Sequence, residues 1–269
     1  QWNDWYRRIL IKDLRCGVSE KTVNKVCKAK GVEHWGVPIF ACALAHDAAN
    51  HEKKLVGPKQ IEVKLDGVRT ITIIRPDSSE LGWSVEMFSR NGKRFENFGH
   101  IEEEIKTAIG LKTPPYGLVL DGEVMSASFQ DLMKQVHRKS DVAAHDAVLH
   151  LFDTLPYTAW RNGGWEKPQK CRSLITYHWV QDNSDVLRHV SALDWTDVNL
   201  DTTQGQEEFS RLNQHALDNG YEGLIVKDPE APYENKRTHS WLKQKPFVEL
   251  SLTVTSVEEG TGRNVGRLG

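Results

Sequence analysis

The sequence is first informative through what it lacks. No apolar run approaches the ~18 residues that a membrane-spanning helix needs, and the first residues lack the apolar core of a signal peptide. We therefore expect no membrane association, and a location in the cytoplasm (that of the host cell if the source is a virus). The chain does not begin with Met, so we expect it to start inside a longer gene product.

Signatures of metal, redox and phosphate-loop sites are also missing. The four cysteines, Cys16, Cys27, Cys42 and Cys171, match no Cys-x-x-Cys spacing. Their even number leaves a disulfide open, but without a secretory signal we expect reduced thiols. The eleven histidines form no His-Glu-x-x-His or His-x-His pattern, which disfavours a zinc enzyme. No G-x-x-x-x-G-K-[ST] phosphate loop occurs.

An excess of charge of either sign is absent as well. Lys plus Arg number 35 and Asp plus Glu 37, so the net charge is −2. This balance excludes a uniformly basic nucleic-acid coat and an acidic tail protein, but it leaves room for a local basic groove. The 269 residues are enough for one large domain or two modest ones with a sizeable core.

Residues 1–30 differ from the rest of the chain, because they carry eight basic and three acidic residues, a net charge of +5. Apolar residues recur at helical spacing before and after Gly17, and Ser19 is a suitable cap for the second helix. One interpretation is a solvated helical hairpin with a charged outer face. The other is the end of a helical module that contacts a phosphate backbone.

From residue 35 onward the pattern indicates a mixture of strands and helices. The sequence predicts strands over 61–65, 70–74, 83–89, 118–125, 148–152, 224–226 and 241–245. It predicts helices over 100–109 and from the capping box Thr203-x-x-Gln206 to Asn219-Gly220, with loops over 155–172 and 229–240. Asp66-Gly67 favours a tight turn that joins the first two strands as a hairpin. After residue 246 only a weakly alternating segment follows, which we interpret as the opening strand of a separate module.

The strongest chemical motif is Lys64-Leu-Asp66-Gly67-Val-Arg69. A lysine fixed at the end of a strand can attack phosphorus when burial or a cationic neighbour keeps its amine neutral. Taken alone, the motif also fits an ordinary surface lysine beside a hairpin turn.

Further motifs follow it in order, each at the end of a predicted strand, within one or around one. They are Ser89-Arg90-Asn91-Gly92, Leu120-Asp121-Gly122-Glu123, His150-Leu-Phe152-Asp153, Glu222-Gly-Leu-Ile-Val-Lys227-Asp228 and Ser240-Trp241-Leu-Lys243-Gln-Lys245.

This ordered set resembles the motif series of the ATP-dependent DNA ligases, most closely in style the bacteriophage type, within the superfamily of covalent nucleotidyltransferases. The resemblance covers residues 35–246 and implies an α+β fold: an adenylation domain of antiparallel sheets flanked by helices. Residues 1–34 resemble the end of a helical DNA-binding domain. Residues 247–269 resemble the first strands of a truncated OB-fold domain.

The resemblance also implies roles for single residues. Lys64 would be the nucleophile that takes AMP from ATP, and Phe152 would stack on the adenine. The remaining ATP or AMP contacts would be Glu62, Arg69, Arg90, Glu123, Lys227, Lys243 and Lys245. Glu123 and Glu222 would hold a Mg²⁺ or Mn²⁺ ion. In this family, lysines, arginines and metal meet the phosphates in place of a phosphate loop.

The implied substrate is nicked double-stranded DNA, which a monomer would seal during replication, repair or recombination. The residues expected to contact it are Arg7, Arg8, Lys12, Arg15, Lys21 and Arg90. Two alternatives remain: an RNA ligase or capping-type nucleotidyltransferase, and a catalytically inactive DNA-binding module. The last basic motif of an OB domain is absent, so we expect slow adenylylation or poor sealing by these residues alone, and a longer natural protein.

Overall fold

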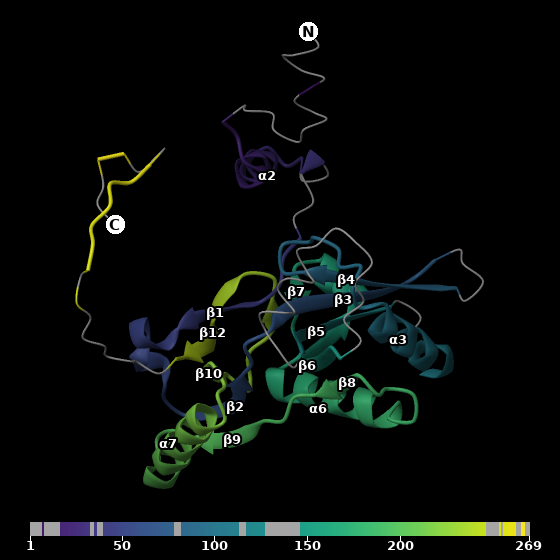
Figure 1. The fold of residues 1–269 in the computed structure, drawn as a ribbon. Coiled ribbons are helices and arrows are strands. Elements are labelled where there is room, and N and C mark those ends of the chain that lie inside the picture. The colour runs from purple at the N-terminus through teal and green to yellow at the C-terminus, as the bar shows by residue number, and fades with distance from the viewer. Residues whose placement is uncertain are drawn as a thin grey trace.

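The computed structural model describes residues 7, 17–32, 35–36, 40–77, 82–112, 117–126, 146–245, 253, 255–261 and 265–266. Its core is built from two five-stranded sheets that lie side by side (Figure 1). This mixed arrangement of largely antiparallel sheets and flanking helices confirms the predicted α+β class. No described helix is long and apolar enough to cross a membrane.

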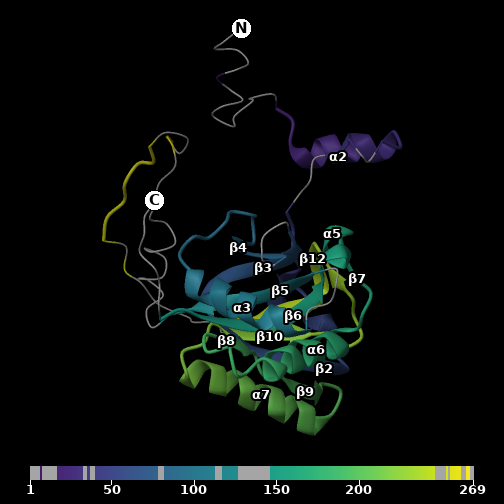
Figure 2. The ribbon, with the colours of Figure 1, turned by 90° about the vertical axis from the view of Figure 1, so that its right-hand side faces the viewer.

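The first sheet has the strand order β1-β12-β10-β2-β9. Its strands are β1 (Leu44–Asp47), β2 (Pro58–Lys64), β9 (Thr196–Asn199), β10 (Gly223–Lys227) and β12 (Arg237–Gln244). Neighbouring strands are antiparallel except for the parallel pair β1 and β12. Helix α7 (Thr203–Asp218) lies along this sheet in Figure 2, where Ala216 packs with Ile61, Leu224 and Val226 in a buried apolar cluster.

The second sheet has the strand order β4-β3-β5-β6-β8. Its strands are β3 (Val68–Pro76), β4 (Trp83–Ser89), β5 (Leu118–Met125), β6 (Val148–Pro156) and β8 (Val190–Ala192). Ile101 and Ile105 of α3 (Gly99–Lys112) pack against Met87 and Leu120 of this sheet in one apolar cluster. A second cluster joins Ile71 of β3 to Tyr233 and Trp241, and so holds the two sheets together.

The smaller elements complete the described chain. They are α2 (Glu20–Ala29), the 3-10 turns η3 (Ala48–Asn50) and η4 (Glu52–Lys54), α5 (Tyr157–Arg161), α6 (Gln169–Asp182), and the two-stranded pair β7 (Gly164–Trp165) and β11 (Tyr233–Glu234). The predicted cap of α2 is confirmed, because the Ser19 side chain accepts a hydrogen bond from the Thr22 N–H.

The predicted hairpin across Asp66-Gly67 is wrong, although both of its strands exist. Strand β2 pairs with β10 and β9, while β3 pairs with β4 and β5, so the turn carries the chain from one sheet to the other. A Cβ atom at Gly67 would lie 2.3 Å from the Val124 carbonyl oxygen. The glycine is therefore needed for close backbone approach at this crossing.

The loops predicted over 155–172 and 229–240 are also wrong, because α5, the start of α6, β11 and the start of β12 occupy them. Helix α6 has no apolar periodicity, because its inner face carries buried polar side chains such as Gln169, Arg172 and Thr176. Arg172 is fully buried and forms a two-point ion pair with Asp153 of β6. A polar inner face of this kind hides a helix from hydrophobic patterning.

Two end-of-element predictions are refined and others stay untested. Thr202, one residue before the predicted box, caps α7 by accepting a hydrogen bond from the Gly205 N–H at 3.0 Å. Asn219 ends that helix as predicted. The helix expected before Gly17 lies outside the described residues except for Arg7, and most of the strand expected after residue 246 lies outside them as well.

Candidate active site

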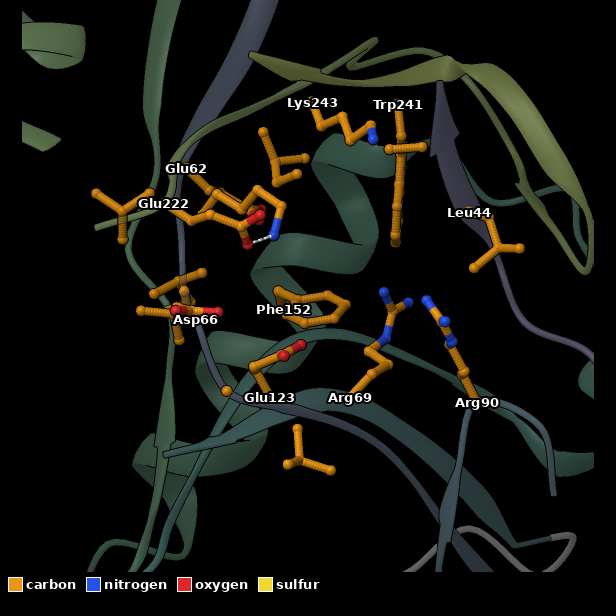
Figure 3. Close-up of a pocket in the computed structure, with 18 of the residues that line it drawn as sticks. Leu44, Glu62, Asp66, Arg69, Arg90, Glu123, Phe152, Glu222, Trp241 and Lys243 are labelled. Carbon is orange, nitrogen blue, oxygen red and sulfur yellow. Dashed lines mark hydrogen bonds and ion pairs between the residues drawn. The ribbon is translucent and has the colours of Figure 1, made fainter. Parts of the chain in front are cut away.

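A pocket of about 690 Å³ opens where the two sheets meet. All ten residues expected to bind ATP, AMP or metal line it, together with the segment between β2 and β3 (Figure 3). They come from strands β2, β3, β5, β6, β10 and β12 and from positions directly beside the ends of β4, β10 and β12. The fold therefore brings together side chains that lie up to 183 positions apart, from Glu62 to Lys245.

Lys64 occupies the end of β2 and is paired with a carboxylate. Strand β10 runs antiparallel to β2, so Gly223 lies opposite Lys64, and the Glu222 N–H donates to the Lys64 carbonyl at 3.0 Å. This pairing places the Glu222 carboxylate against the Lys64 ammonium (dashed in Figure 3). The Lys64 side chain is 21% exposed, so its amine is reachable from the pocket.

Glu222 is shared between two lysines. Its second oxygen forms an ion pair with Lys245, which follows β12. Partial burial acts to raise the pKa of Glu222, but the hydrogen bonds from Lys245 and Lys64 outweigh it and lower that pKa. The hydrogen bond that Lys245 donates to Glu222 raises the pKa of Lys245. The carboxylate is thus held charged between the two ammonium groups.

Glu123 of β5 lies across the pocket, opposite Arg69 in the register of β3 and β5. Burial raises its pKa to about 7, although the charges of Arg69 and Lys64 act in the other direction. Among the described residues, no side chain donates a hydrogen bond to it, and the backbone N–H of Gly67 is its one donor. A buried carboxylate with so few donors is ready to receive a cation.

Arg69 is clamped rather than free. Its guanidinium donates to both oxygens of the fully buried Asp121, at 2.6 and 2.7 Å, and to the Ala43 carbonyl at 3.2 Å. The Tyr233 hydroxyl donates to the same Asp121 carboxylate at 2.6 Å. Burial works against the charged form, yet the Asp121 carboxylate holds the pKa of Arg69 well above its usual range. Arg69 is therefore a fixed cation, 4.5 Å from the centre of the Phe152 ring.

Lys227 forms the second clamped cation. It is 1% exposed, and its ammonium donates to Glu62 at 2.6 Å and to the Phe152 carbonyl at 3.2 Å. It also lies 4.5 Å from the Trp241 ring centre. Burial raises the pKa of Glu62, against the opposing effect of Lys227. Glu62 and Lys227 therefore form a buried ion pair in the lining of the pocket, in which each neutralises the charge of the other.

Two rings and two further cations complete the lining. Phe152 and Trp241 meet edge to face at 6.0 Å, and Figure 3 shows Phe152 in the middle of the pocket with Arg69 and Arg90 reaching in beside it. Arg90 is exposed at the rim, and Lys243 lies 3.4 Å from Asp47.

The expected DNA contacts are less well defined. Arg7 is exposed, while Arg8, Lys12 and Arg15 and the side chain of Lys21 lie outside the described residues. Sequence reasoning missed Trp241, Asp121 and Tyr233 as parts of the site. Asp121 and Trp241 belong to motifs that the sequence analysis identified, but their contacts with other site residues could not be predicted. Tyr233 lies in the segment over 229–240 that was interpreted as a loop, and no motif in the sequence marked it as a site residue.

Two largely antiparallel sheets with a strand-end lysine, buried carboxylates and clamped cations around an aromatic ring define a nucleotidyltransferase domain. Residues 42–245 match the family model described as "ATP dependent DNA ligase domain". The chain belongs to this family of ATP-dependent DNA ligases.

Individual relatives agree with the family. A DNA ligase of Halobacterium salinarum is 31% identical over 231 residues, which cover 78% of this chain and 36% of that protein. A solved structure named "Pmar-Lig_PreS3" is 59% identical, covers 100% of this chain and 60% of its own, and superposes with a TM-score of 0.86. The ATP-dependent DNA ligase from bacteriophage T7, solved in complex with ATP, has 21% identity, coverage of 76% and 67%, and a TM-score of 0.58. This last likeness concerns the fold alone.

The chain spans only part of these proteins: 36% of the Halobacterium salinarum ligase and 60% of the chain named "Pmar-Lig_PreS3".

Proposed function

We propose that the chain is the adenylylating core of a DNA ligase that uses ATP to seal nicks in duplex DNA. The observation that carries the proposal is the placement of Lys64, which stands at a strand end inside a pocket lined by four carboxylates, two clamped cations and an aromatic pair. Residues 1–34, 35–246 and 247–269 would then be the end of a helical DNA-binding domain, the adenylation domain and the start of an OB-fold domain.

In the first step Lys64 would act as a nucleophile. Its Nζ forms a bond to the α-phosphorus of ATP, the bond from that phosphorus to the bridging oxygen breaks, and pyrophosphate leaves with the electron pair. The amine must be neutral to attack, so its ion pair with Glu222 has to open. Glu222 is in contact with the ammonium, but its lowered pKa keeps it charged, so the proton of Lys64 would leave to water as the pair opens.

The clamped cations would position the nucleotide. Arg69 lies over the Phe152 ring, so a base stacked on that ring would come close to a fixed positive charge. Stacking of a base on an aromatic side chain contributes about 1–3 kcal/mol. Lys243 and Lys245 would meet the phosphates, and the segment around Glu62 would contact the adenine edge.

The donor chemistry of the pocket fits a divalent ion. Glu123 and Glu222 offer the hard oxygen ligands that Mg²⁺ or Mn²⁺ prefers. A cation beside Glu123 would also keep that carboxylate charged, although burial raises its pKa to about 7. When bound, the ion would offset charge on the triphosphate and favour the departure of pyrophosphate.

The later steps would use DNA. AMP passes from Lys64 to the 5′-phosphate at the nick, and the 3′-hydroxyl then attacks that phosphate and releases AMP. Contacts should go mainly to the DNA backbone, because a ligase accepts any sequence. The exposed Arg90 at the pocket rim is the described residue best placed for such a contact. The basic residues of the first 21 positions are proposed as further contacts on their charge alone.

The test is transfer of label from α-³²P-ATP to the protein in the presence of Mg²⁺, followed by a denaturing gel. Wild type and Lys54→Ala, which changes an exposed lysine of η4, should label equally. Lys64→Ala should not label. Label on Lys64→Ala would reject Lys64 as the nucleophile, and label from GTP in preference to ATP would point to a capping enzyme. Sealing of nicked DNA by this chain, compared with nicked RNA, tests the substrate.

A further inference from the structure

Three histidines from separate elements converge beside the pocket. His46 belongs to β1, His51 links η3 to η4, and His239 belongs to β12. The rings of His46 and His239 stack at 4.1 Å, and His51 meets them edge to face at 4.8 and 4.4 Å. One nitrogen from each ring lies within 4.8 Å of the nitrogens offered by the other two. None of the three lines the pocket.

The local structure holds two of these rings in place. The ladder between β1 and β12 is irregular at this point, because Thr238 pairs with Ala45 but Leu242 pairs with His46. His239 therefore lies in a bulged stretch that turns its ring toward His46. His51 follows η3, whose first turn is capped by Asp47 through the Ala49 N–H at 3.2 Å. The His51 N–H donates to the Ala48 carbonyl at 2.8 Å, which fixes its backbone.

The ring nitrogens of the three histidines are free of polar partners in the described part of the chain. Within the described part of the chain, no ring nitrogen of His46, His51 or His239 takes part in a hydrogen bond or ion pair. Neutral imidazoles with free lone pairs are the form in which histidine binds metal.

We propose that His46, His51 and His239 together bind one divalent transition-metal ion, with Zn²⁺ as the expected occupant. Three imidazole nitrogens and one water make a common four-coordinate zinc set. Zn–N distances of about 2.0–2.1 Å place tetrahedral ligands about 3.3 Å apart, so the nitrogens would move together by side-chain rotation. An all-nitrogen set disfavours Mg²⁺, which prefers oxygen, so this site would be separate from the one at Glu123 and Glu222.

A metal here would tie β1 to β12, the pair at one edge of the first sheet. Strand β12 carries Trp241 and Lys243 into the pocket, and Lys243 lies 3.4 Å from Asp47, the neighbour of His46. The ion would therefore act as a structural clip on a strand that lines the nucleotide pocket. The Asp47 carboxylate supplies nearby negative charge, and Arg237 supplies nearby positive charge that weakens binding.

The experiment measures binding of Co²⁺ and Zn²⁺ to the untagged, metal-free chain in excess Mg²⁺, which occupies carboxylate sites. We expect one equivalent of bound Co²⁺ with the strong visible absorption of tetrahedral coordination. A near-saturating amount of Zn²⁺ should raise the Tm by roughly 5 °C. Both effects should disappear in His239→Gln and in His51→Gln. The control is His178→Gln, which changes an exposed histidine of α6 and should bind as wild type does.

The variants can be checked independently of metal. His239 is exposed, so its replacement should leave the metal-free Tm unchanged, and His51→Gln provides a second test if it does not. Absence of stoichiometric binding by wild type would overturn the proposal. Full binding by a folded His239→Gln or His51→Gln chain would overturn it as well.

Discussion

The buried pair of Lys227 and Glu62 allows one sharp prediction. The two side chains are 1% and 3% exposed and meet at 2.6 Å. Lys227→Met keeps most of the apolar stem but removes the ammonium, which leaves Glu62 buried without its counter-ion. Loss of one partner of a buried ion pair costs about 3–5 kcal/mol. We expect the free energy of unfolding of Lys227→Met to fall by about that amount at pH 8.

The loss should depend on pH in a defined direction. Burial already raises the pKa of Glu62, and Lys227 opposes that effect, so removing Lys227 raises the pKa further. A carboxyl group whose folded pKa exceeds its unfolded value of about 4.3 loses stability as the pH rises between the two values, by about 1.4 kcal/mol per pH unit. The variant should therefore be closer to wild type at pH 5 than at pH 8.

Urea unfolding followed by tryptophan fluorescence would measure these differences. Lys227→Met combined with Glu62→Gln should recover about 2 kcal/mol relative to the sum of the single changes, because the double variant leaves no buried charge. The control is Lys170→Met, which breaks the exposed pair with Glu230 and should leave the midpoint unchanged. The reasoning is refuted if Lys227→Met behaves like this control, or if its loss is the same at pH 5 and pH 8.

Three further predictions follow from single groups in and beside the pocket. Gly67→Ala should cost about 1–3 kcal/mol and slow adenylylation, because its Cβ would lie 2.3 Å from the Val124 carbonyl oxygen; unchanged unfolding and labelling would contradict this. Burial raises the pKa of Glu123 to about 7, so the contribution of this group to the free energy of unfolding should fall as the pH rises from about 4.3 to 7. A pH series of urea titrations should show a smaller fall for Glu123→Gln than for wild type. Burial raises the pKa of Cys42 to about 11, so iodoacetamide at pH 8 should alkylate the partly exposed Cys171 much faster, and mass spectrometry showing equal rates would count against the buried thiol.

Much of the candidate site could be predicted from the sequence because its residues stand in local motifs at strand ends. Alternation over 61–65 and the apolar run over 118–125 located β2 and β5, and these strands carry Lys64 and Glu123 into the pocket. Strand periodicity is a local property, since successive side chains face opposite sides of the sheet. The order of the motifs carried the resemblance that assigned nucleotide or metal roles to these residues, and the structure places all of them in the lining of one pocket.

Features that join distant parts of the chain could not be predicted in the same way. The inner face of α6 is polar and becomes intelligible only when Arg172 meets Asp153. The tight turn at Asp66-Gly67 gives no sign that its two strands belong to different sheets, because strand partners are chosen by packing elsewhere.

The sequence by itself was enough to locate the motifs on their strands, to predict the α+β class and to select Lys64 as the candidate nucleophile. Only the tertiary structure decided how the charges are paired: Lys227 with Glu62, and Arg69 with Asp121 and Tyr233. It alone also brought together three histidines that no spacing rule connects. The physical reason is that a buried charge or an imidazole lone pair is satisfied by whatever lies nearest in space, and sequence separation does not determine that distance.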